Sequence, residues 1–160
     1  HHFDFMNWWL RAYPVEVVAD GRLQHYGKNC PFRAANCRVC PHKKDCRFYY
    51  DIGTNPTRTK LYVEAESDDN YYRDACVFRN DIDIYDSMQA IVKYSNGATL
   101  SYSLNTLMPF EGYRVAFNGE LGRLEVRDYE RQPWDVAAGE ETEMYVTRSF
   151  GRRRRVPILQ

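Results

Sequence analysis

The dipeptide Asn96-Gly97, set between two segments in which apolar and polar residues alternate, constrains the fold most. Residues 88–95 and 98–105 lie on either side of it, and their period of two predicts strands. Asn-Gly is the most favourable pair for a tight hairpin, because both central residues of that turn need positive φ. We therefore predict an antiparallel hairpin at this point of the chain.

A second turn, Asn-Gly-Glu at residues 118–120, separates residues 113–117 from residues 121–129 and predicts a hairpin of the same kind. Residues 144–150 also alternate and predict a further strand. Since successive hairpins build an antiparallel sheet, the second half of the chain is expected to be β-structure.

The first residues predict a helix followed by a strand. Residues 3–11 carry apolar side chains at helical spacing, namely Phe3, Met6, Trp9 and Leu10. Pro14 ends this helix, and residues 15–21 form a strand closed by a glycine. The helix is expected to cover one face of the sheet, so we predict an α+β fold built on a large open, mostly antiparallel sheet with helices on one face.

The 160 residues fit a single domain, residues 1–160, with a cysteine-rich insert at about residues 24–60. The insert has too little apolar periodicity to form a core of its own, so we expect covalent or metal bonds to hold it. After it, residues 61–65 are a candidate short strand and residues 68–74 a polar turn or short helix.

Charge and hydropathy exclude several partners. Lysine plus arginine equals aspartate plus glutamate at 22 each, so no overall field favours nucleic acid. A basic run at residues 152–155 is balanced by acidic residues at 64–69, and no recognition helix follows the cysteines, so we expect no nucleic-acid partner. No apolar run reaches the roughly 18 residues of a membrane span, and no secretory signal is visible.

Four cysteines of the insert have metal-ligand spacing: Cys30, Cys37, Cys40 and Cys46. A Cys-x-x-Cys knuckle lets two thiolates reach one tetrahedral ion, the other two cysteines complete the set, and His42 is a substitute ligand. Structural zinc is one interpretation. Disulfides or plain thiols, with Cys76 free, are the other main interpretation, and an iron–sulfur cluster is a third. The compartment stays open, because zinc and disulfides indicate opposite redox environments.

Acidic and apolar residues alternate over residues 81–86. In a strand, Asp81, Asp83 and Tyr85 would share one face, where two carboxylates and a phenol could bind sugar hydroxyls. The alternative is an exposed start of a strand with solvated acids. Nowhere in the chain is there a Gly-x-Gly-x-x-Gly fingerprint of a dinucleotide fold, so a cofactor domain is expected to lie outside it.

Three motifs together resemble a known family. The opening His-His-Phe-Asp-Phe-Met-Asn-Trp-Trp-Leu of residues 1–10, with Pro-Val-Glu-Val at 14–17, is similar to the first helix and strand of the C-terminal domain in the glucose-fructose oxidoreductase and inositol dehydrogenase family (Gfo/Idh/MocA). Residues 118–125, Asn-Gly-Glu-Leu-Gly-Arg-Leu-Glu, resemble its late hairpin. The Cys-x-x-Cys-Pro insert resembles one found in a subgroup of the family.

The resemblance implies a two-domain dehydrogenase that acts on a sugar, a polyol or a sugar derivative, of which this chain is the C-terminal, substrate-binding domain. NAD or NADP would be bound mainly by an N-terminal Rossmann domain absent from this chain, and the sheet would also form a homo-oligomer interface. By alignment, His1 is the catalytic residue that moves the proton of the substrate hydroxyl, with His2 as the second candidate.

The opening inside a helix is expected to mark a fragment that is inactive alone, although His1 and His2 could instead be the remnant of a purification tag. The alternative function is a non-catalytic oligomerisation or binding domain whose cysteine loop is only structural. The sugar, the choice between NAD and NADP, and the reaction direction are not specified by the sequence.

Overall fold

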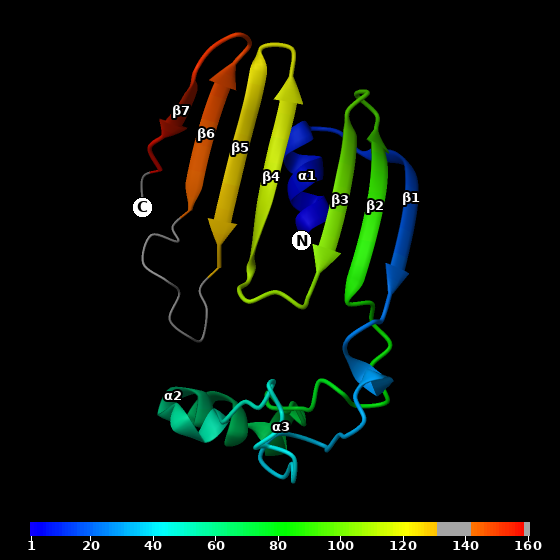
Figure 1. Cartoon of the computed structure of the whole chain (residues 1–160), viewed down its shortest axis with the longest axis vertical. Helices are drawn as coiled ribbons and strands as arrows, with labels where there is room; N and C mark the ends of the chain where they lie inside the picture. Colours follow the sequence, from blue (N-terminus) through cyan, green and yellow to red (C-terminus); the bar gives the residue numbers. More distant parts are fainter. Residues whose placement is uncertain (131–141, 159–160) are drawn as a thin grey trace. The chain divides into compact units, whose positions relative to one another are not determined.

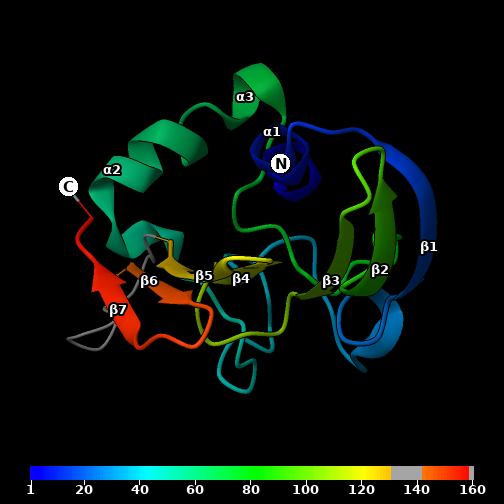
Figure 2. The ribbon, with the colours of Figure 1, turned by 90° about the horizontal axis from the view of Figure 1, so that it is seen from above.

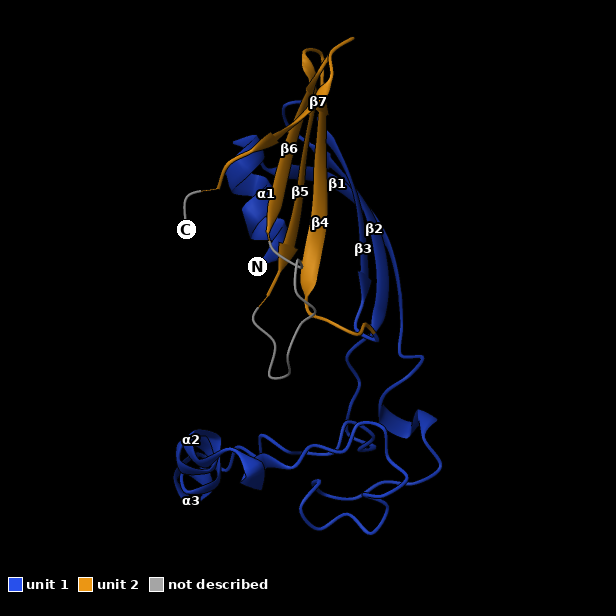
Figure 3. Cartoon of the chain, turned by 60° about the vertical axis from the view of Figure 1, so that its left-hand side comes forward, with its two compact units in different colours: residues 1–107 blue, residues 108–160 orange. Residues whose placement is uncertain are grey.

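The structure, a computed structural model, describes residues 1–130 and 142–158. The chain divides into two compact units, residues 1–107 and residues 108–160 (Figure 3). Each unit contains one antiparallel sheet, so the predicted α+β, mostly antiparallel fold is confirmed, with the described strands distributed over two sheets. Within these described ranges, every helix is too short or too polar to cross a lipid bilayer.

The sheet of the first unit has three strands in the order β1 (Pro14–Arg22), β2 (Ser87–Tyr94) and β3 (Thr99–Asn105) (Figure 1). All neighbours are antiparallel, and Val92 at the centre of β2 lies opposite Val17 of β1 and Leu100 of β3. The strands predicted over residues 15–21, 88–95 and 98–105 are therefore confirmed as β1, β2 and β3.

Helix α1 (His2–Leu10) covers one face of this sheet, as predicted. Its Met6 and Leu10 pack against a cluster in which Val92 and Tyr94 are almost completely buried, and Figure 2 shows α1 to one side of the strands. The helix ends before Pro14, because Arg11 adopts a left-handed conformation and its amide donates to the last helical carbonyls. The apolar spacing of the opening segment thus builds the core of this unit.

The turn between β2 and β3 differs from the predicted one. Gly97 has a φ of 86°, but Asn96 is not in the positive-φ region, so only one of the two residues is left-handed. Asn96 instead uses its side chain: Oδ1 accepts from the amide of Ala98 at 3.1 Å, and Nδ2 donates to the carbonyl of Leu10 at 3.1 Å. Asn96 therefore links the β2–β3 hairpin to the end of α1. Its side-chain hydrogen bonds, and not a positive φ, explain why an asparagine occupies this position.

Between β1 and β2 the chain forms only short helical turns. They are η1 (Gly27–Asn29), η2 (Ile52–Thr54), α2 (Pro56–Arg58), η3 (Thr59–Val63) and α3 (Glu66–Asp69). The strand predicted over residues 61–65 is wrong, because those residues begin inside the π-helical turn η3. Asn55 caps α2 by accepting from the amide of Arg58 at 3.1 Å, and Pro56 occupies the first helical position. This start signal outweighs the β-propensity of the residues that follow. The predicted polar turn or short helix overlaps α3.

The insert packs against residues that lie between it and β2. Ile52, Cys76 and Phe78 are buried, and the rings of Phe48 and Phe78 meet edge to face with centres 5.4 Å apart. Tyr26 contacts both rings. Aromatic residues far apart in the sequence therefore supply the packing that local periodicity does not show.

One buried carboxylate fastens the insert to the sheet. Asp86 is 2% exposed, and its oxygens accept hydrogen bonds from the amides of Gln24, His25 and Tyr26 at 2.9, 2.7 and 3.0 Å. Burial by itself would raise its pKa, but these three amides and the Ser87 hydroxyl lower the pKa of Asp86 to about 2. The carboxylate is therefore ionised at neutral pH and closes the loop that leaves β1.

The sheet of the second unit has four antiparallel strands in sequence order (Figure 1). They are β4 (Gly112–Gly119), β5 (Gly122–Tyr129), β6 (Glu143–Arg148) and β7 (Arg153–Val156). The predicted strand over residues 144–150 is confirmed by β6. The turn before β5 is shifted from its predicted position, because Gly119 lies opposite Gly122 and the connection is Glu120-Leu121.

Strand β7 was not predicted, because residues 152–155 were considered only as a basic run and the last predicted strand covered residues 144–150. Arg153, Arg154 and Arg155 lie opposite residues 147, 146 and 145 of β6. Arginine stems can line a half-exposed strand while the guanidinium groups remain in water. The basic run is thus an edge strand.

Candidate functional site

The two histidines at the start of α1 have different surroundings. His1 is exposed at the N-cap position, and its side chain makes no capping hydrogen bond to the helix. His2 lies against the sheet, with its Nδ1 2.9 Å from the hydroxyl of Tyr102 on β3. Burial raises the pKa of Tyr102, so its hydroxyl stays protonated at neutral pH and can hydrogen bond to the imidazole. The pair fixes the start of the helix on the sheet.

The three residues proposed as a sugar-binding face are not in a strand. Asp81, Asp83 and Tyr85 lie in an irregular segment that precedes β2, so alternation does not place them on a common face. The physical reason is that the ladder ends here: the amide of Asp86 donates to the carbonyl of Arg22, the last residue of β1, at 3.0 Å, and β1 supplies no partner for the residues before Asp86. A role of the three residues in substrate binding stays a prediction.

Two of these three residues, Asp81 and Tyr85, have local contacts. Asp81 pairs with the guanidinium of Arg79 at 3.0 Å, and this contact lowers the pKa of Asp81. The ring of Tyr85 lies directly over Gly21 of β1, where an added Cβ would come within 2.4 Å of it. Asp83 is exposed. Only Tyr85 is therefore held in place by the sheet.

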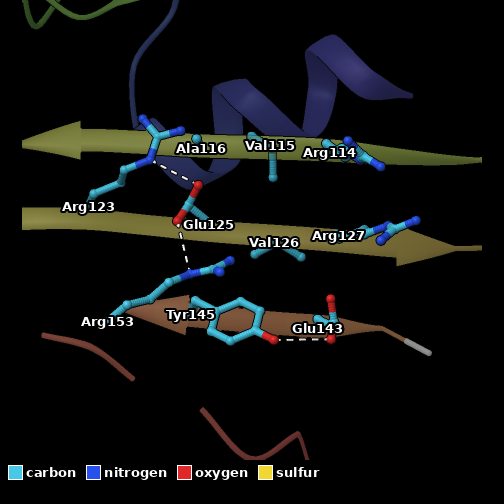
Figure 4. A pocket seen from close by; sticks show the side chains of 10 residues that line it. All are labelled: Arg114, Val115, Ala116, Arg123, Glu125, Val126, Arg127, Glu143, Tyr145 and Arg153. Carbon is cyan, nitrogen blue, oxygen red and sulfur yellow. Dashed lines mark hydrogen bonds and ion pairs between the residues drawn. The ribbon is translucent and has the colours of Figure 1, made fainter. Parts of the chain in front are cut away.

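A shallow hollow of about 430 Å³ lies on the sheet of the second unit (Figure 4). We call it the arginine hollow. It is lined by Arg114, Val115, Ala116, Arg123, Glu125, Val126, Arg127, Glu143, Tyr145 and Arg153.

The centre of the arginine hollow is a network of charges and an aromatic ring. Glu125 lies 3.2 Å from Nε of Arg123 and 3.5 Å from Nε of Arg153. The guanidinium of Arg153 stacks 3.6 Å from the ring centre of Tyr145, whose hydroxyl donates to Glu143 at 3.1 Å. Guanidinium groups in this setting can donate to carboxylate, phosphate or hydroxyl oxygens of a ligand or of another protein.

The arginine hollow was not predicted from the sequence, although the alternating residues of β5 indicate a charged face. In β5 the residues Arg123, Glu125 and Arg127 alternate with Leu124 and Val126, which places the three charged side chains on one face. What the sequence did not show is that Arg153 of β7 reaches the same face, because β7 itself was not predicted.

Three of the four cysteines assigned as metal ligands lie together. Cys37, Cys40 and Cys46 line a small cavity of about 10 Å³, and the fourth cysteine that lines it is Cys76, whereas Cys30 is not among its lining residues. The substitute ligand His42 stacks on the ring of Phe32 with centres 4.6 Å apart.

All five cysteines are free thiols. In the described ranges, no group of three or more His, Cys, Asp or Glu side chains is placed to hold a metal ion. The disulfide interpretation, the zinc interpretation and the iron–sulfur interpretation of the loop therefore all remain predictions at this point.

Comparison with known proteins gives one relative. A protein of Bacillus subtilis (strain 168) named "Putative oxidoreductase YteT" is 37% identical over 142 residues, which are 81% of this chain. The match covers 33% of that relative, so the chain spans about a third of its length. No family model matches the chain, and no solved structure matches it significantly.

Proposed function

We propose that this chain is the substrate-binding C-terminal domain of an NAD(P)-dependent oxidoreductase of the Gfo/Idh/MocA type, acting on a sugar, a polyol or a sugar derivative. The observation that carries the proposal is the 37% identity, over 81% of the chain, to a protein whose name is that of an oxidoreductase. About two thirds of that relative lies outside the match, which leaves room for a separate nucleotide-binding domain.

The start of α1 is the proposed place of proton transfer. His2 has its Nδ1 occupied by Tyr102, whereas His1 is exposed, so His1 is the imidazole free to meet a substrate from another domain. An imidazole titrates near neutral pH and can take the proton of a hydroxyl group. NAD or NADP, when bound by the other domain, supplies the acceptor for the hydride.

The outer side of α1 also supports a neighbouring domain. Trp8 is 76% exposed, and the rings of Phe5 and Trp9 stack on each other with centres 5.6 Å apart while both remain partly exposed. Large aromatic side chains gathered on one short helix are typical of a surface that another domain or chain covers. We assign this surface to the nucleotide-binding domain.

The test uses the full-length protein with a panel of sugars and polyols, and follows the reduction of NAD and NADP by absorbance. We expect turnover with at least one sugar or polyol, and a loss of roughly 100-fold or more in kcat for His1→Ala, as for removal of a general base. The matched control is Tyr102→Phe, which removes the hydroxyl that hydrogen bonds to His2 and should change activity far less.

If no member of the panel is oxidised, or if His1→Ala retains full activity, the proposal is wrong. In the second case a larger loss for His2→Ala would move the proton-transfer role to His2.

A second candidate is a non-catalytic oligomerisation domain, and the arginine hollow favours it because arginine and tyrosine are enriched in protein interfaces. A homo-oligomer through this sheet is also compatible with the enzyme. Light scattering on the wild type and on Arg153→Glu tests the interface: we expect the variant to dissociate, and an unchanged mass would remove this sheet face as the interface.

A further inference from the structure

Cys76 lies beside the cysteine loop although it is distant in the sequence. Asn36 and Ala75 form an isolated antiparallel bridge. On either side of it the amide of Cys37 donates to the carbonyl of Asp74 at 2.8 Å, and the amide of Cys76 donates to the opposite segment at 3.1 Å. The bridge thus brings the segments of Cys37 and Cys76 together, and both residues line the same small cavity.

Two backbone turns bring the other thiols to the same place. The amide of Cys40 donates to the carbonyl of Cys37 at 3.2 Å, which closes the knuckle, and the amide of Cys46 donates to the carbonyl of His42 at 3.1 Å. The cavity that these cysteines share with Cys76 has a volume of about 10 Å³. That volume accommodates about one water-sized sphere, and hence a single ion.

We propose that Cys37, Cys40, Cys46 and Cys76 bind one structural zinc ion as thiolates, with Cys30 outside the ligand set. Four thiolates at about 2.3 Å form the closed tetrahedral shell typical of structural zinc. A cavity for one ion favours zinc over a cluster of several irons. Binding replaces the thiol protons, which are released to solvent. This proposal does not depend on the oxidoreductase function.

The four proposed ligands line one cavity but are not arranged as a finished metal site. Within residues 1–130 and 142–158, no three potential ligands are placed so that they could hold a metal ion. A cysteine side chain has a single heavy-atom torsion, and we expect zinc binding to rotate these side chains toward a common point.

A buried ion pair holds the two ligand-bearing segments together before any metal binds. Arg38, next to Cys37, donates to both carboxylate oxygens of Asp74 at 3.0 and 3.1 Å, and Asp74 is 2% exposed. The same guanidinium donates to Glu66 at 2.5 Å. The bidentate contact with Asp74 is a charge-assisted pair of hydrogen bonds between the two segments. Asp74 and Cys76 are therefore fixed relative to the knuckle.

Zinc binding displaces the thiol protons of the four cysteines, so the affinity for zinc should fall as the pH is lowered.

The test compares metal content in three forms of the purified chain: wild type, Cys76→Ser and Cys30→Ser. We expect about one zinc per chain in the wild type and in Cys30→Ser, and at least a tenfold lower affinity in Cys76→Ser. Cobalt substitution gives a second readout, because tetrahedral thiolate coordination has a characteristic visible spectrum that should weaken only in Cys76→Ser. Zinc retained by Cys76→Ser and lost by Cys30→Ser would overturn the ligand set.

A measurement on the wild type avoids any variant that fails to fold. Thiol alkylation, read by mass spectrometry with and without a chelator, should become faster at Cys37, Cys40 and Cys46 when zinc is removed, and stay unchanged at Cys30. Disulfides, the visible absorbance of an iron–sulfur cluster, or metal-free protein with five unprotected thiols would each contradict the zinc proposal.

Discussion

At the scale of single residues, Asp86 determines how the insert is attached. Its carboxylate is buried and accepts from three consecutive backbone amides. Asp86→Asn keeps the size of the side chain but loses the charge, so we expect a loss of about 2 kcal/mol in unfolding free energy. Urea denaturation at neutral pH measures it. The control is Asp20→Asn, because Asp20 is exposed and forms a surface ion pair with Arg22, and it should change stability by less than about 0.5 kcal/mol.

The pH dependence of stability has a defined sign at this residue. The pKa of Asp86 is about 2 in the folded chain and about 3.9 in an unfolded chain, so the unfolded state binds more protons between these values. The stabilisation is complete above about pH 4 and is lost as the pH falls through about 2. Asp86→Asn should flatten this part of the stability profile, and an unchanged acid slope would contradict the assignment.

At the scale of secondary-structure elements, two glycines are required for different reasons. Gly97 has a φ of 86° but nothing within 4 Å of an added Cβ, so only backbone strain opposes a side chain there. Gly122 has a φ of 144°, and an added Cβ would meet the carbonyl oxygen of Thr147 on β6. Gly97 allows the backbone conformation of the turn between β2 and β3, whereas Gly122 allows β5 and β6 to lie close together.

We therefore expect Gly97→Ala to cost about 1 kcal/mol and Gly122→Ala about 3 kcal/mol or more. Chemical denaturation of the two variants side by side measures the difference. Equal losses of unfolding free energy in the two variants would show that the approach of Thr147 on β6 is not the reason for a glycine at position 122. Gly97→Asn serves as the control, because asparagine tolerates the left-handed region better than alanine.

At the scale of the whole molecule, the two compact units should respond differently to loss of the proposed zinc. The cysteines and the Arg38–Asp74 pair belong to residues 1–107, whereas β4 to β7 belong to residues 108–160. Hydrogen exchange with and without a chelator should show faster exchange over residues 30–80 and unchanged protection in β4 to β7. Faster exchange in both units would mean that they unfold together.

Much of the fold follows from the sequence because its causes are local. The spacing of Met6 and Leu10 determined the covering face of α1, and the alternation around Gly97 determined the β2–β3 hairpin. The failures have local causes too. A proline and an asparagine cap at residues 55–56 turned a predicted strand into helical turns, and residues 81–85 lie outside the sheet because β1, their would-be partner, ends at Arg22.

Tertiary structure alone decided which distant residues meet. The sequence predicts that Cys37 and Cys40 lie close together, because only two residues separate them. It could not select Cys76 over Cys30, since that choice depends on the bridge between Asn36 and Ala75. Likewise, alternation in β5 determined a charged face, but the pairing of β7 with β6 brought Arg153 to Glu125. Local periodicity encodes faces, while long-range backbone pairing determines which faces come together.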